Sequence, residues 1–149
     1  MAIIVGAAAP DFTLKNQDKG DVTLSSFRDK QNVVLGFYVY DFSPICEKEN
    51  ACFTSDLPKI SAAGTVVFGV SRDSTWSHKA FREKMGYTHD LLADVGCKVA
   101  KAYGLYQEPL DAAVRSTVIV DKQGKVAFVK IHDGQRDDAE ILAALANLH

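Results

Sequence analysis

The sequence from Val33 to Phe53 reads VVLGFYVYDFSPICEKENACF and changes character near its middle. Residues 33–38 form a nearly continuous apolar run, which is typical of a β-strand covered on both faces. Ser43 suits the N-cap of a helix, and Pro44 suits its first position because no partner is needed there for the N–H that proline lacks. The stretch therefore predicts a buried strand followed by a helix that begins at residue 44 and ends before Gly64.

The flanking sequence predicts further strands and helices in alternation. Two short alternating segments, 12–14 and 22–24, surround a polar turn and indicate a hairpin. Strands are expected at 65–70, 91–92, 116–120 and 126–131, and helices at 74–84 and 97–103 and around Ile141 to Leu145. This order predicts an α/β thioredoxin-like fold over a single domain, residues 1–149, with a mixed central β-sheet flanked by helices and an N-terminal β-hairpin extension.

Composition excludes several function classes. The 149 residues include 17 basic and 19 acidic side chains, a net charge of −2, with no long run of either sign. Nucleic-acid and anionic-membrane binding are therefore not expected, and no apolar segment approaches the ~20 residues of a membrane helix. The first residues lack the basic region of a secretion signal, so we expect a cytoplasmic location.

The metal-binding residue types show no ligand spacing. The three cysteines include no C-x-x-C pair, and the four histidines are scattered and expected at the surface. Neither a metal nor a cofactor is predicted, and Trp76 and Phe81 are expected to pack one face of their helix. A free thiol remains as the source of chemistry.

Cys46 is the thiol with a functional setting. If Ser43 is the N-cap, Cys46 lies in the first helical turn, where unpaired N–H groups and the helix dipole favour a thiolate. Ser43 is expected to cap the helix with its oxygen while its hydroxyl proton reaches a reactant near the sulfur. A buried and inert cysteine is the alternative, and it is common near helix starts.

The whole segment FYVYDFSPICEKE resembles the active-site segment of the peroxiredoxins, in which a Ser or Thr stands three residues before a reactive cysteine. Ser43, Cys46 and Glu49 match the hydroxyl residue, the peroxidatic cysteine and a frequent acidic residue. APDFTL at 9–14, AKAYG at 100–104 and RSTVIVD at 115–121 also resemble this family. The chain is thus similar to AhpC/TSA-type thiol peroxidases, among them the small members related to bacterioferritin comigratory protein and AhpE. Val39 departs from the pattern, because the family has a proline there.

The resemblance implies a chemistry. Cys46 would attack a hydroperoxide, hydrogen peroxide or an organic one, and become a sulfenic acid. Arg115 would stabilise the thiolate and polarise the peroxide, while Ser43 and the Cys46 N–H would hold the peroxide oxygens. A homodimer is also implied, through loops that carry Tyr40 and Phe42 and, after Gly104, Leu105 and Tyr106.

The residues allow more than one thiol to reduce the oxidised Cys46. Cys52 follows Cys46 by six residues, one more than the family's usual spacing in this helix, and Cys97 would need another segment to approach. We therefore expect an external thiol of the thioredoxin, glutaredoxin or low-molecular-weight type, with Cys52 and Cys97 as possible resolving residues. A thioredoxin-like thiol–disulfide oxidoreductase, which would lack its second active-site cysteine, and a non-enzymatic redox sensor are the alternatives.

Overall fold

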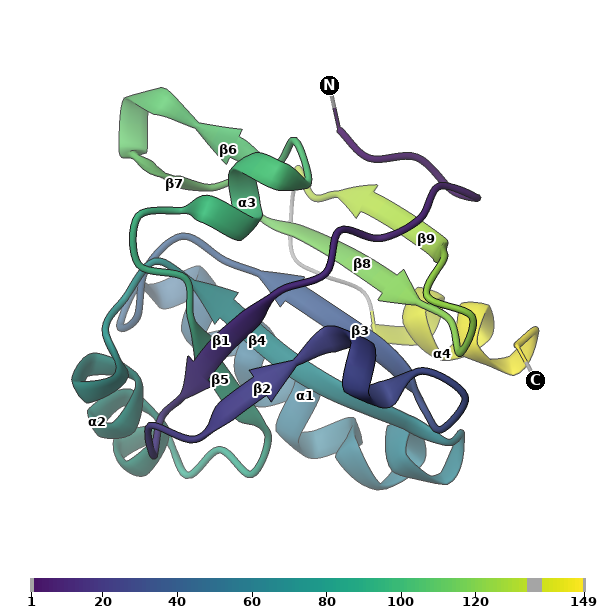
Figure 1. Ribbon diagram of the computed structural model, residues 1–149. Coiled ribbons are helices and arrows are strands. Elements are labelled where there is room, and N and C mark those ends of the chain that lie inside the picture. The colour runs from purple at the N-terminus through teal and green to yellow at the C-terminus, as the bar shows by residue number, and fades with distance from the viewer. Residues whose placement is uncertain (1, 134–137, 149) are drawn as a thin grey trace.

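The computed structural model describes residues 2–133 and 138–148, so the predicted domain of residues 1–149 includes six positions outside this range. A sheet of seven strands forms its centre, in the order β2-β1-β5-β4-β3-β8-β9 (Figure 1). The strands are β1 (Thr13–Asn16), β2 (Asp21–Thr23), β3 (Asn32–Phe37), β4 (Thr65–Ser71), β5 (Asp90–Ala93), β8 (Ser116–Val120) and β9 (Val126–Ile131). The α-helices are α1 (Pro44–Ala62), α2 (Thr75–Met85), α3 (Lys98–Ala102) and α4 (Asp138–Ala146).

The sheet is mixed, as predicted. β3 pairs in parallel with β4 and antiparallel with β8, and all six of its residues are buried. The hairpin β1–β2 joins the other side of the sheet by antiparallel pairing of β1 with β5. The predicted mixed α/β fold with an N-terminal hairpin is therefore confirmed, and β8 and β9 have the predicted bounds.

Alternate residues of β3 pack into different parts of the core. Leu35 and Phe37 face a cluster that includes Val99 and Tyr103, whereas Val34 faces α1 and α4. Tyr38, just past the strand, belongs to a third cluster with Cys46, Phe81, Tyr87 and Leu91. The Cys46 side chain at the start of α1 thus packs against the end of β3, against α2 and against the residues that follow α2.

The structure adds short elements that the sequence did not predict. They are the 3-10 helices η1 (Leu24–Phe27) and η2 (Glu108–Leu110) and a small hairpin of β6 (Tyr106–Gln107) and β7 (Ala112–Ala113). Tyr40 donates its hydroxyl proton to the Leu110 carbonyl at 2.7 Å, which ties this hairpin to the loop before α1. Arg72 reaches the same hairpin through an ion pair with Asp111.

Several predictions of exposure were wrong. Trp76 is 71% exposed and stacks under the Lys19 ammonium, whereas Phe81 on the same helix is fully buried. His78, His89 and His132 are buried, not at the surface as expected. Leu105, assigned above to a dimer-forming loop, lies in the core with 0% exposure and is not available to a partner subunit.

Candidate active site

The loop between β3 and α1 places Cys46 in the third position of the helix, as predicted. Ser43 has the extended backbone of an N-cap, and its carbonyl accepts a hydrogen bond from the Glu47 N–H at 2.9 Å. Its side chain does not cap the helix: the Ser43 hydroxyl donates instead to the Tyr40 carbonyl at 2.9 Å. The predicted capping role was therefore wrong. Because α1 has no side-chain cap, the N–H groups of Ile45 and Cys46 remain available for an anionic reactant at the positive end of the helix.

Cys46 itself is 1% exposed and is a free thiol. Ile45 beside it is 51% exposed, so the first turn of the helix is at the surface while the sulfur points inward. Phe42, one residue before the N-cap, has a left-handed backbone with φ of 70°. A bulky residue rarely adopts this conformation, which costs about 1–3 kcal/mol. Phe42 is held there by its ring contact with Phe81 at 4.9 Å.

Arg115 reaches the same helix through Glu49. The Arg115 Nη1 lies 2.6 Å from Glu49 Oε1, and Glu49 is fully buried while the arginine side chain is 16% exposed. Glu49 follows Cys46 by three residues, which places the two side chains on one face of α1. Arg115 also contacts the carbonyl of His132, a residue whose ring bonds to Thr117 on β8. The structure thus brings two separately predicted site residues, Arg115 and Glu49, together one helical turn from Cys46.

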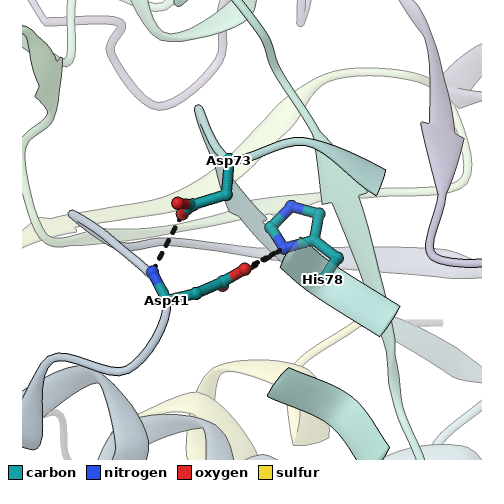
Figure 2. A group of neighbouring side chains, drawn as sticks. All are labelled: Asp41, Asp73 and His78. Carbon is teal, nitrogen blue, oxygen red and sulfur yellow. Dashed lines mark hydrogen bonds and ion pairs between the residues drawn. The ribbon is translucent and has the colours of Figure 1, made fainter. Parts of the chain in front are cut away.

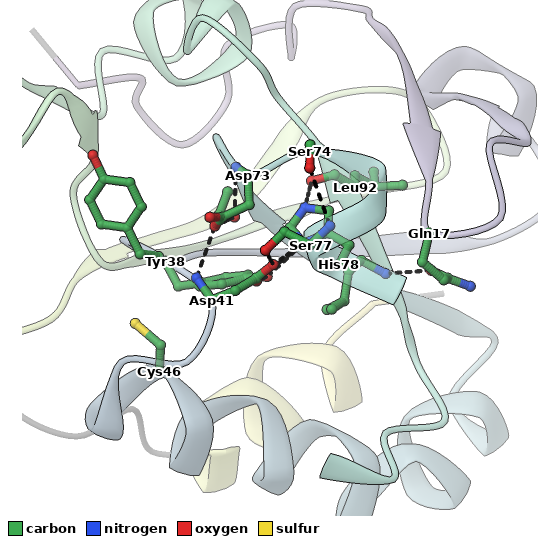
Figure 3. A network of polar contacts seen from close by, with 12 residues as sticks. Gln17, Tyr38, Asp41, Cys46, Asp73, Ser74, Ser77, His78 and Leu92 are labelled. Atoms are coloured by element: carbon green, nitrogen blue, oxygen red, sulfur yellow. Dashed lines mark hydrogen bonds and ion pairs between the residues drawn. The ribbon is translucent and has the colours of Figure 1, made fainter. Parts of the chain in front are cut away.

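A buried polar network that the sequence did not predict fixes the loop before the helix. The Asp41 carboxylate lies 2.8 Å from His78 Nδ1 and accepts hydrogen bonds from the hydroxyls of Tyr38 at 2.5 Å and Ser77 at 2.8 Å. Figure 3 shows the network above the start of α1, where Cys46 lies. Burial, followed by the negative charge of Asp41, raises the pKa of Tyr38 well above its usual value, so the tyrosine remains a donor.

Asp73 joins this group from the end of β4 (Figure 2). It accepts the Asp41 backbone N–H at 2.9 Å and the Ser71 hydroxyl at 2.5 Å, and burial raises its pKa. Ligand atoms of Asp41, Asp73 and His78 lie within 4.8 Å of one another, which is close enough to hold a metal ion. The same atoms are engaged in hydrogen bonds, and His78 Nε2 donates to the Leu92 carbonyl at 2.9 Å. Their arrangement is therefore accounted for by the protein's own donors and acceptors.

Comparison with known proteins identifies the family of this chain. Residues 5–129 match the model of the AhpC/TSA family. The chain belongs to the AhpC/TSA family, the peroxiredoxins. Alkyl hydroperoxide reductase E of Mycobacterium bovis is 34% identical over 148 residues, which cover 95% of this chain and 97% of that protein. Chloroplastic peroxiredoxin Q of Suaeda salsa is 40% identical over 125 residues, which cover 83% of this chain but only 58% of that protein.

Solved peroxiredoxin structures share the fold. The crystal structure of the peroxidoxin BcpB from Mycobacterium tuberculosis has a TM-score of 0.90, 26% sequence identity and 97% coverage of both chains. The reduced 2-Cys peroxiredoxin of Plasmodium vivax has a TM-score of 0.89 and 27% identity over 97% of this chain and 81% of that one. These likenesses confirm the thioredoxin-like α/β architecture that the sequence predicted.

The other two cysteines lie apart from the Cys46 sulfur. Cys52 is six residues further along the same helix, about 240° around its axis and about 9 Å along it. A disulfide needs the two Cα atoms within about 7 Å. Cys46 and Cys52 therefore cannot form a disulfide while the first turns of α1 stay helical. Cys97 packs in the cluster on the opposite face of β3, and burial raises its thiol pKa. Neither lies in position to attack Cys46 in this conformation.

Val39 replaces the proline expected from the peroxiredoxin pattern. It remains apolar and partly buried against the cluster that contains Cys46. The bonds of Asp41 to Tyr38, Ser77 and His78 fix the loop two residues later. In this chain, side-chain bonds therefore supply a constraint on the loop in the absence of the proline ring.

Proposed function

We propose that this peroxiredoxin is a thiol peroxidase that reduces hydrogen peroxide and organic hydroperoxides at Cys46. The observation that carries the proposal is the position of Cys46 in the first, uncapped turn of α1, one turn from the buried pair of Arg115 and Glu49. Uncapped N–H groups and the helix dipole favour a thiolate at this position. Family membership supports the same chemistry.

The reaction follows from these groups. The Cys46 thiolate attacks one peroxide oxygen, an S–O bond forms as the O–O bond breaks, and the departing oxygen takes a proton to become water or an alcohol. The Ile45 and Cys46 N–H groups are placed to stabilise negative charge on the peroxide oxygens. The Ser43 hydroxyl, bonded to the Tyr40 carbonyl at rest, can turn to a peroxide oxygen. Arg115 adds a fixed positive charge beside the helix turn.

The cysteine sulfenic acid is returned to the thiol by an external reductant. We propose a one-cysteine cycle because neither Cys52 nor Cys97 lies in position to attack Cys46. A thiol of the thioredoxin, glutaredoxin or low-molecular-weight type would first form a mixed disulfide with Cys46 and release water. A second thiol equivalent would then restore the Cys46 thiol.

We further propose a homodimer and a cytoplasmic location. Phe42 is 42% exposed, Ile45 is 51% exposed and Leu110 is 49% exposed, and the Tyr40 hydroxyl ties Leu110 to the loop that carries Phe42. This apolar surface beside the active site would be covered in a symmetric dimer. Three cysteines that are all free fit a reducing compartment.

The test is hydroperoxide consumption with a supplied dithiol. We expect turnover by the wild type and by the Cys97→Ser control, and none by Cys46→Ser, whose hydroxyl is not ionised at neutral pH. Equal turnover by the Cys46→Ser variant would refute the proposal. Rapid oxidation of Cys46 without turnover would indicate a redox sensor instead, and reduction of insulin disulfides would indicate an oxidoreductase.

A further inference from the structure

Two buried side chains bind the backbone carbonyls in the first turn of α1. Asn50 Nδ2 donates to the Cys46 carbonyl at 3.0 Å, and the Tyr87 hydroxyl donates to the Glu47 carbonyl at 2.6 Å. Asn50 is fully buried and Tyr87 is 4% exposed. A helical carbonyl normally accepts only the N–H four residues further on, so these two carbonyls are held by side chains in addition.

His89 fixes the orientation of Asn50. The Cys46 carbonyl can only accept, so the Asn50 amide must turn its nitrogen toward it and its oxygen toward His89 Nε2, which lies 2.9 Å away. His89 Nε2 therefore carries a proton. On the other side of the ring, Nδ1 lies 2.8 Å from the Thr54 hydroxyl, which itself accepts the Thr88 N–H at 3.0 Å.

A continuous chain of hydrogen bonds runs from Thr88 to the Cys46 carbonyl. The Thr88 N–H donates to the Thr54 hydroxyl, which bonds to His89 Nδ1, and His89 Nε2 donates to the Asn50 side-chain oxygen. Asn50 then donates to the turn that carries the reactive sulfur. Because the Cys46 carbonyl can only accept, the bonds of His89 and Asn50 have one possible direction, which fixes the orientation of the buried amide.

Gly69 on β4 makes room for this support. A Cβ atom at residue 69 would lie 2.7 Å from Asn50 Oδ1, a distance that real Cβ contacts do not show. The same atom would lie 2.8 Å from Leu91 Cδ2. A larger residue at position 69 would therefore displace the Asn50 amide or Leu91. Gly69 does not have a positive φ, so close packing against Asn50 is what distinguishes this glycine.

We propose that Asn50, oriented by His89, is a positioning residue that keeps the first turn of α1 wound after Cys46 is oxidised. The proposal rests on the proposed peroxidase function and explains its one-cysteine form. Cys46 and Cys52 can meet only if this turn unwinds, and unwinding would break the bond from the buried Asn50 amide as well as the backbone bonds. The Cys52 thiol therefore cannot attack the sulfenic acid of Cys46, and an external thiol reacts with it instead.

The two competing reactions start from the same sulfenic acid. Peroxide converts the Cys46 thiolate to a sulfenic acid and releases hydroxide or alkoxide, which takes up a proton. In an unwound turn, the Cys52 thiol would attack the Cys46 sulfur, form a disulfide and release water. In the wound turn, the thiol of an external reductant makes the same attack and releases the same water. In the proposal, the bond from Asn50 to the Cys46 carbonyl determines whether Cys52 or an external thiol attacks the Cys46 sulfur.

The first experiment measures the support without peroxide. Amide hydrogen exchange at residues 50 and 51, whose N–H groups pair with the Cys46 and Glu47 carbonyls in the helix, would be compared in the reduced wild type, Asn50→Ala and His89→Phe. Loss of a buried hydrogen bond should raise exchange there by about 5- to 100-fold. Ile60→Val is the matched control, because it loosens the core packing of the same helix ten residues beyond Asn50. Unchanged exchange in both test variants, or an equal rise in Ile60→Val, would overturn the proposal.

The second experiment follows the oxidised cysteine by mass spectrometry after one equivalent of hydrogen peroxide. We expect a sulfenic acid that dimedone traps in the wild type, and a Cys46–Cys52 disulfide in Asn50→Ala that disappears in Asn50→Ala/Cys52→Ser. A wild-type Cys46–Cys52 disulfide, or a dimedone adduct of unchanged yield in Asn50→Ala, would overturn the proposed role. Absence of any reaction at Cys46 would refute the peroxidase proposal, and the exchange experiment would still decide whether Asn50 supports the turn.

Discussion

Replacing Arg115 with Met should destabilise the protein as well as stop its reaction with peroxide. The Arg115 guanidinium is the ion-pair partner of Glu49, which is fully buried. Methionine keeps the length of the side chain but removes the cation and its donors. The variant therefore leaves a carboxylate inside the protein without the charge that faced it, and an uncompensated buried charge is among the costliest single changes.

The expected cost can be estimated from that burial. Removing one partner of a buried ion pair costs about 3–5 kcal/mol of unfolding free energy. For a domain of about 150 residues, 1 kcal/mol shifts Tm by about 2–4 °C, so we expect Tm to fall by about 6–20 °C.

A second substitution separates stability from chemistry. In Arg115→Met/Glu49→Leu the buried charge is gone, and apolar replacement of a buried pair is often neutral or stabilising. Denaturant unfolding should show stability near that of the wild type, while stopped-flow measurement with hydrogen peroxide should show Cys46 oxidation as slow as in Arg115→Met. Recovery of the peroxide rate in the double variant would refute the reasoning, because the cation would then act only by neutralising Glu49.

Three further predictions depend on which side chains are buried and which are exposed. Burial raises the pKa of Cys97, so at neutral pH iodoacetamide should alkylate this thiol more slowly than Cys46. Peptide mapping over a pH series measures both rates, and faster alkylation of Cys97 would contradict the choice of Cys46 as the reactive thiol. Phe42→Asp should convert a dimer into a monomer in sedimentation experiments, and a wild-type monomer at micromolar concentration would contradict the proposed interface. Phe81→Ala should lower the free energy of unfolding by about 3–5 kcal/mol, because Phe81 is fully buried. Trp76→Ala, at an exposed position, should change it by no more than about 0.5 kcal/mol. Equal losses for the two variants in denaturant unfolding would contradict this prediction.

The sequence predicted the elements that depend on local pattern. The bounds of β8 and β9 follow from apolar runs separated by a Gly-containing turn, and α2 begins after Ser74, whose hydroxyl accepts the Ser77 N–H at 3.2 Å. Gly86 ends α2 in the left-handed conformation. In each case the residues that decide the structure are neighbours in the chain, so the signal is contained in a short window.

The buried histidines were missed because their partners are distant in the sequence. His78 Nδ1 faces the Asp41 carboxylate, 37 positions earlier, and His89 faces Asn50, 39 positions earlier. A histidine on an amphipathic helix or beside a strand looks the same in sequence whether it is solvated or paired. Only the fold shows that each ring fills a buried site where both nitrogens have partners.

The hydrogen bond of Ser43 also differs from the prediction because the fold of the loop decides its partner. Ser before Pro at a helix start favours a side-chain cap, but the loop from Tyr40 to Ser43 brings the Tyr40 carbonyl within 2.9 Å of the Ser43 hydroxyl, and that carbonyl accepts its hydrogen bond. The helix start is fixed instead by two other side chains: Asp41 holds the loop before it through a bond to the distant His78, and Asn50 holds the Cys46 carbonyl within the helix. Because these supports do not use the first N–H groups of α1, those groups are left to the peroxide oxygen that the proposed mechanism places there.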